Sequence, residues 1–144
     1  MLEAKELPPE LSYLTVTDQP LPNDPPRSVW SNLRRLHAVL SVFSRTVGPI
    51  HVSSGYRSAE VNEAVGGVPT SLHRKGRAAD IQLATPEKTR EFFLALASDP
   101  SVLPGTISEL ILYVYGDTPS HLHVGIPEQG LAPQPVIRTK RFTA

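Results

Sequence analysis

The clearest alternation of hydrophobic and polar residues lies in the first third of the chain. Its apolar positions, three or four residues apart, are Leu33, Leu36, Leu40, Phe43 and Val47. That spacing places the apolar side chains on one face of a helix and leaves the polar residues on the other. The pattern therefore predicts an amphipathic helix over residues 28–47, ended by Gly48 and Pro49.

Shorter segments farther along the chain predict the other elements. Strands are expected at residues 50–53, 78–83, 110–114 and 122–126, with a further edge strand at 136–142. Short helices are expected after Ser58, which can cap a helix ending at Gly66, and from Thr85 to about Ser98. A Gly-Asp-Thr-Pro turn joins two of the strands as a hairpin. These elements predict an α+β fold with helices packed on one antiparallel sheet.

Proline is unevenly distributed and divides the chain into two parts. Six of the 15 prolines fall within the first 26 residues, where fixed φ angles and missing N–H donors disfavour a helix. We therefore expect residues 1–27 to form an extended arm. Residues 28–144 are expected to form one domain, because 144 residues suit a single core.

Composition excludes several classes of protein and of metal site. Lys plus Arg and Asp plus Glu number 14 each, so the chain lacks the basic excess typical of nucleic-acid binders. No apolar run approaches the roughly 18 residues of a membrane span. The chain has no cysteine, so disulfides and thiolate-held metals are excluded. Any metal ion must be bound by His, Asp or Glu.

The first ten residues bear on where the chain is made. They include Glu3, Lys5 and Glu6 and lack the apolar region of a secretory signal. We therefore expect synthesis in the cytoplasm without a recognisable signal peptide.

Four side chains carry candidate metal chemistry. Asp80 projects from a predicted strand, and His73 lies on the loop before it, with small residues between them that permit close approach. His121 and His123 are two residues apart on a strand and share a face, so one or both can meet this pair. Two imidazoles and a carboxylate are three ligands of a tetrahedral zinc ion, whose fourth position stays open for water. The alternative is that these are ordinary polar surface residues.

Several motifs together resemble a known family. They are Ser54-Gly55-Tyr56-Arg57-Ser58, Asn62, Val65-Gly66-Gly67, Ser71-x-His73-x-x-Gly76-x-Ala78-x-Asp80-Ile81 and His121-x-His123-Val124. In this order, spanning roughly residues 25–126, they resemble the zinc D-alanyl-D-alanine carboxypeptidases. That family includes phage endolysin-like and bacterial peptidoglycan peptidases, and it shares its fold and zinc site with murein endopeptidases and the hedgehog domain.

The resemblance implies specific roles for individual residues. It implies that His73, Asp80 and His123 bind one Zn²⁺ ion. By position, Arg57 matches an arginine that binds a substrate carboxylate, a pairing that guanidinium geometry favours. Ser71 matches a serine that orients substrate or backbone, although a turn or cap hydroxyl is an equal alternative.

The sequence departs from the carboxypeptidase pattern three positions before the last ligand. That position is acidic in the family and is Ser120 here, which cannot act as a general base at neutral pH. His121 matches the His-x-His arrangement of the endopeptidase and hedgehog branches, and Asp117 falls where the hedgehog domain has an acidic residue. We expect His121 to transfer the proton with assistance from Asp117, and Glu109 is a less favoured candidate.

These inferences predict a zinc metallopeptidase. Its expected partner is a peptidoglycan peptide, and the monomer is the favoured oligomeric state. The expected reaction is hydrolysis of peptide bonds in peptidoglycan stem peptides by zinc-activated water, as a D,D-carboxypeptidase or an endopeptidase. The expected site of action is the cell wall, reached by phage-type release or delivery with a virion. The alternative is a non-catalytic zinc-binding domain of a phage particle or a wall-binding module.

Overall fold

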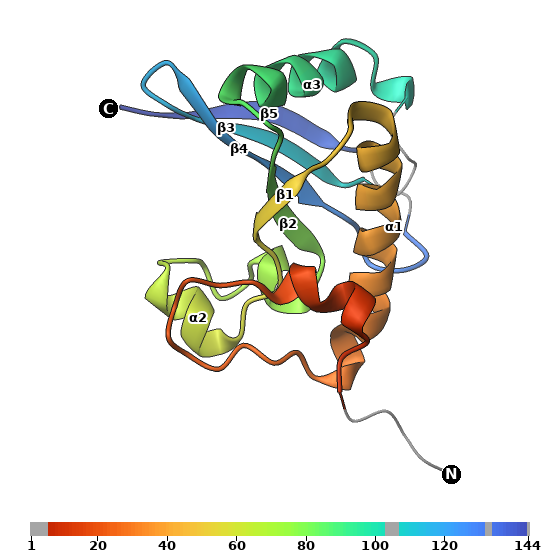
Figure 1. The fold of residues 1–144 in the computed structure, drawn as a ribbon, viewed down its shortest axis with the longest axis vertical. Coiled ribbons are helices and arrows are strands. Elements are labelled where there is room, and N and C mark those ends of the chain that lie inside the picture. Colours follow the sequence, from red (N-terminus) through yellow and green to blue (C-terminus); the bar gives the residue numbers. More distant parts are fainter. Residues whose placement is uncertain (1–5, 103–106, 132–133, 144) are drawn as a thin grey trace.

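A five-stranded sheet organises the computed structural model, which describes residues 6–102, 107–131 and 134–143 (Figure 1). The strands are β1 (His51–Ser54), β2 (Ala78–Gln82), β3 (Glu109–Tyr115), β4 (Thr118–Gly125) and β5 (Val136–Phe142). The α-helices are α1 (Trp30–Val47), α2 (Ala59–Ala64) and α3 (Pro86–Ser98). Short 3₁₀ helices are η1 (Pro9–Thr15), η2 (Arg27–Val29), η3 (Leu72–Lys75) and η4 (Pro100–Val102). The predicted α+β class is confirmed.

The direction of β5 corrects the expectation of a purely antiparallel sheet. The strand order is β1-β2-β4-β3-β5, and β5 pairs with β3 in parallel, whereas the other pairs are antiparallel. Both edges of β4 are already occupied, by β2 and β3, and the chain that leaves β4 pairs next at the outer edge of β3. A strand entering there after reversing direction runs parallel to β3.

Successive side chains along each strand point to opposite faces of the sheet, and the two faces have different roles. One face buries apolar side chains against α1 and α3, which contact each other through Phe43 and Phe92, with ring centroids 5.1 Å apart. The core residues that the sheet contributes to this face include Ala79, Ile81, Leu110, Leu112, Leu122 and Val124. Because neighbouring residues of a strand point to opposite faces, Asp80, His121 and His123 lie on the other face.

The proline-rich segment is not uniformly extended. Within it, η1 begins at Pro9, whose fixed φ suits the first turn of a helix, and buries Leu11 and Leu14 completely. The backbone N–H of Tyr56 donates to the Leu14 carbonyl, 2.6 Å away. A Cβ atom at Gly55 would overlap that carbonyl oxygen, so glycine permits the close approach. The segment after β1 is thereby packed directly against η1.

Among the residues that the structure describes, none forms a helix both long and apolar enough to cross a lipid bilayer.

Candidate metal centre

A cleft of about 850 Å³ lies on the sheet face opposite α1 and α3. Seven sequence-predicted side chains line it. They are the candidate ligands His73, Asp80 and His123, together with Arg57, Ser71, Glu109 and His121. They come from the turn after β1, the η3 region and strands β2, β3 and β4. The cleft therefore gathers most of the side chains that the sequence singled out.

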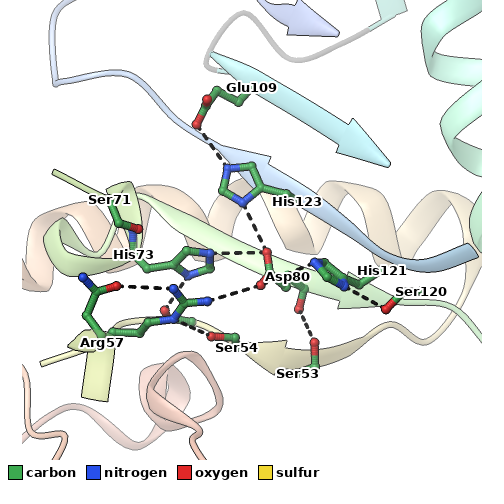
Figure 2. Close-up of polar contacts among 12 residues, drawn as sticks. Ser53, Ser54, Arg57, Ser71, His73, Asp80, Glu109, Ser120, His121 and His123 are labelled. Atoms are coloured by element: carbon green, nitrogen blue, oxygen red, sulfur yellow. Dashed lines mark hydrogen bonds and ion pairs between the residues drawn. The ribbon is translucent and has the colours of Figure 1, made fainter. Parts of the chain in front are cut away.

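Three of these side chains converge around one point. His73, Asp80 and His123 each offer a ligand atom, and these atoms all lie within 4.8 Å of one another. His73 Nε2 is 3.3 Å and His123 Nδ1 is 3.2 Å from Asp80 Oδ1 (Figure 2). The contact between Asp80 and His123 follows from register, because these two residues are directly opposed on β2 and β4.

Local structure orients His73. The Ser71 hydroxyl accepts a hydrogen bond from the His73 backbone N–H and caps η3, and Gly76 ends η3 with a positive φ of 69°. The His73 Nδ1 atom lies 2.8 Å from the carbonyl oxygen of Gly55, which can only accept. Nδ1 therefore carries a proton, and Nε2 is the nitrogen that faces Asp80 and the cluster.

A second carboxylate orients His123. Glu109 Oε1 lies 3.1 Å from His123 Nε2 on the side away from Asp80. A deprotonated carboxylate accepts, so Nε2–H donates to Glu109 and Nδ1 faces the cluster. Sequence reasoning considered Glu109 only as a proton carrier, and the register of β3 with β4 places it instead as a partner of His123.

The buried charges of the cluster stabilise one another. Burial opposes ionisation of Asp80, but hydrogen bonds from His123 and His73 outweigh it and hold the pKa of Asp80 well below its ordinary value. Burial by itself lowers the pKa of His123, yet hydrogen bonds to Asp80 and Glu109 raise it to about 9. The site without metal thus holds a carboxylate that attracts positive charge.

Arg57 is fixed beside the cluster by three polar contacts. Its Nε donates to Ser54 Oγ at 3.1 Å, and one terminal nitrogen lies 3.4 Å from Asn62 Oδ1. The other terminal nitrogen lies 3.6 Å from Asp80 Oδ2. Burial lowers the pKa of Arg57, while the Asp80 charge acts in the opposite direction. These contacts hold a guanidinium group at the wall of the cleft.

His121 lies next to the three ligand candidates. Its Nδ1 is 3.0 Å from Ser120 Oγ, and its Nε2 is 3.8 Å from Asp80 Oδ2. The ring stacks on Tyr113, with centroids 4.4 Å apart. The β3–β4 register shifts between Tyr113 and Val114, which leaves Ser120 as an extra residue of β4 beside His121. Burial lowers the pKa of His121, with the Asp80 charge opposing, and so favours the neutral ring.

Comparison with known protein families assigns the chain to one of them. A sequence profile described as Peptidase M15 matches residues 5–101, about two thirds of the chain, including His73 and Asp80. The chain belongs to the Peptidase M15 family. No curated protein matches the chain. Both histidines of β4 lie beyond the matched residues, so their place in the site comes from the structure.

Peptidase M15 proteins are zinc peptidases, and the cluster suits such an ion. Two imidazole nitrogens and a carboxylate oxygen are a ligand set that zinc accepts, and the chain offers no thiolate. His73 and Asp80 are buried, and both histidines have a partner for the nitrogen that faces away from the cluster. The group of His73, Asp80 and His123 could therefore hold a metal ion.

Two other sequence-predicted residues, the proposed acid–base assistant Asp117 and the proposed orienting residue Ser71, differ in their relation to the cleft. Asp117 is exposed at the turn between β3 and β4 and is not among the residues that line the cleft. Its backbone carbonyl accepts a hydrogen bond from Arg90 on α3, which keeps the turn near that helix. The expected assistance from Asp117 therefore has no support in the geometry. Ser71 lines the cleft, and its hydroxyl accepts from the His73 backbone N–H, which is the cap that the sequence offered as an alternative and which orients the backbone of a candidate ligand.

Proposed function

We propose that this M15 peptidase is a zinc-dependent enzyme that hydrolyses peptide bonds of peptidoglycan stem peptides. The observation that carries the proposal is the convergence of His73, Asp80 and His123 within 4.8 Å, in a cleft that Arg57 also lines. The family supports peptide hydrolysis, and the earlier motif resemblance supports the stem peptide as substrate.

His73, Asp80 and His123 would hold one zinc ion. When bound, zinc supplies Lewis-acid chemistry that acidifies water and polarises a carbonyl group. Gly55 and Glu109 support this role by fixing the protons of the two histidines on the nitrogens that face away from Asp80.

Arg57 is suited to bind a carboxylate of the peptide. Its guanidinium lines the cleft and is held by Ser54 and Asn62, so little side-chain freedom is lost when substrate binds. A carboxylate there would receive charge-assisted hydrogen bonds. The side chain also lies close to the ligand cluster, which would place the bound carboxylate near the scissile bond.

His121 is suited to move the proton. When its Nδ1–H donates to Ser120 Oγ, the Nε2 lone pair is free beside the cluster and can accept a proton. The lowered pKa of His121 keeps this form populated at neutral pH. Return of that proton to the leaving amine would complete hydrolysis. Ser120 then acts as a positioning residue in place of the acidic residue expected there.

A non-catalytic zinc domain is the second candidate, and Ser120 favours it. No carboxylate occupies the position three residues before His123, so a binding module that retains the metal site would look similar. The two candidates differ in whether peptide bonds are broken.

Purified murein and a synthetic stem pentapeptide test the proposal. The zinc-loaded chain should release soluble fragments that mass spectrometry identifies, and a chelator should stop the release until zinc is restored. His73→Ala should abolish it. Murein and pentapeptide that stay intact with zinc-loaded protein would overturn the enzyme proposal, and zinc-dependent murein binding without cleavage would establish the second candidate.

A further inference from the structure

The edge strand β5 contributes a basic and aromatic wall to the cleft. Arg138, Lys140 and Phe142 alternate along β5 and all line the cleft. They lie opposite Ile111, Tyr113 and Tyr115 of β3, which line it too. The wall is therefore an extension of the sheet face that carries the candidate metal centre.

Aromatic contacts hold Lys140 in place. Its Nζ lies 5.6 Å from the centroid of the Tyr113 ring and 5.4 Å from that of Phe142. These two rings are stacked, with centroids 6.0 Å apart, and Tyr113 also stacks on His121. A continuous row of rings thus connects His121 of the site with Lys140, and it restrains the ammonium group at the cleft surface.

The two cations of the wall form no close ion pair in the described part of the chain, although the charge of Arg138 acts on the cleft carboxylate Glu109 from farther away. In residues 6–102, 107–131 and 134–143, no carboxylate forms an ion pair with Arg138 or Lys140. The cleft carboxylates Asp80 and Glu109 are engaged with the histidines of the cluster. Two basic side chains that make no direct ion pair, beside a peptide-binding site, favour an anionic group on the ligand.

We propose that Arg138 and Lys140 form a second carboxylate-binding subsite, across the candidate metal centre from Arg57. This inference rests on the proposed function and adds to it a substrate class: a peptide with acidic groups on both sides of the scissile bond. Arg57 lies at the β1–β2 side of the sheet and the basic wall at the β5 edge, with His121 and His123 of β4 between them.

The strand order sets the spacing of the two acidic groups. From β2, where Asp80 contacts Arg57, to β5 there are three strand-to-strand spacings, roughly 14 Å. An extended peptide covers that span with about four residues. The subsite therefore selects a carboxylate about four residues from the one that Arg57 binds.

Binding of matched peptides to the full chain tests this directly. The probe is the pentapeptide Ala-γ-D-Glu-Lys-D-Ala-D-Ala, whose glutamate keeps a free carboxylate. One comparison peptide has that carboxylate converted to a carboxamide, and another has only the terminal carboxylate converted. Calorimetry is performed after chelation of metal, and KM and kcat are measured with zinc.

The double variant R138Q/K140Q should bind the free-acid probe at least about tenfold more weakly. Its affinity for the comparison peptide whose glutamate carboxylate is converted to a carboxamide should equal that of the unaltered chain. With zinc, KM for the free-acid probe should rise while kcat changes little. R141Q is the matched control, because Arg141 is exposed on the same strand and does not line the cleft; it should behave as the unaltered chain does.

Two results would overturn the subsite. One is an unchanged preference for the free-acid probe in R138Q/K140Q, and the other is an equal loss in R141Q, which would indicate a general charge effect. Thermal unfolding establishes that both variants are folded. The unaltered chain could bind the free-acid probe more tightly than the carboxamide peptide without cleaving either. If only R138Q/K140Q then loses this binding preference, the proposed function fails and the subsite stands.

Discussion

Asp80 and His123 face each other across the adjacent strands β2 and β4, with Asp80 Oδ1 3.2 Å from His123 Nδ1. Glu109 lies on the far side of the same imidazole, so His123 is held between two carboxylates. In the metal-free protein this favours a doubly protonated ring. A metal ion at the cluster requires the opposite state, with Nδ1 unprotonated, so proton release accompanies metal binding.

The stability of the metal-free protein should therefore fall as the pH rises from about 6.5 to about 9. The pKa of His123 is raised from 6.5 to about 9, so its contribution is complete below 6.5 and is lost through about 9. The shift corresponds to about 3 kcal/mol. Thermal unfolding in the presence of chelator measures this, and H123N should flatten the decline. A flat melting temperature across this range in the unaltered chain would contradict the assignment.

Removing Glu109 should weaken zinc binding without removing a ligand. E109A should lower zinc affinity by roughly 10–100-fold, because His123 loses the acceptor that fixes its proton on Nε2. E109Q keeps an accepting oxygen and should lose less. Competition with a chromophoric chelator measures the affinities. Glu128, exposed and outside the cleft, supplies the control E128A. Equal zinc affinity in E109A and the control would refute the positioning role.

Removing the His121 imidazole should affect turnover and spare metal binding. H121A should reduce kcat on the stem pentapeptide by roughly 10²–10⁴-fold, the usual contribution of a general acid–base group. Its zinc affinity should stay that of the unaltered chain. D117N should change neither quantity, because Asp117 is exposed and outside the cleft. A D117N enzyme as impaired as H121A would restore Asp117 to the mechanism.

The close approach of η1 to the turn after β1 should make Gly55 intolerant of a side chain. In G55A the new Cβ would overlap the Leu14 carbonyl oxygen, and backbone is less able than a side chain to move aside. The expected loss of stability is about 1–3 kcal/mol. Because the Gly55 carbonyl also orients His73, zinc affinity should fall as well. Chemical denaturation with and without zinc measures both effects, and unchanged stability would disprove the packing argument.

Local periodicity was sufficient to predict most elements. The three- and four-residue spacing from Leu33 to Val47 predicted α1, and the hydroxyls of Ser58 and Thr85 cap α2 and α3 as expected. The alternation that put His121 and His123 on one face also predicted their approach to His73 and Asp80. In these cases the information lies within a few neighbouring residues.

Long-range pairing was the part that sequence could not supply. The direction of β5 depends on which strand edges remain free, and the contact of Glu109 with His123 depends on the register of β3 with β4. Asp117 has a suitable residue type and spacing, but the turn carries it out of the cleft. The basic wall of Arg138 and Lys140 arises only once β5 lies beside β3.

Anomalous diffraction at the zinc edge, from crystals of the full chain grown with zinc, tests the central claim most directly. We predict one peak bonded to His73 Nε2, an Asp80 carboxylate oxygen and His123 Nδ1, with Glu109 retained on His123 Nε2. A zinc ion bound elsewhere, with His73, Asp80 and His123 without metal, would contradict the account.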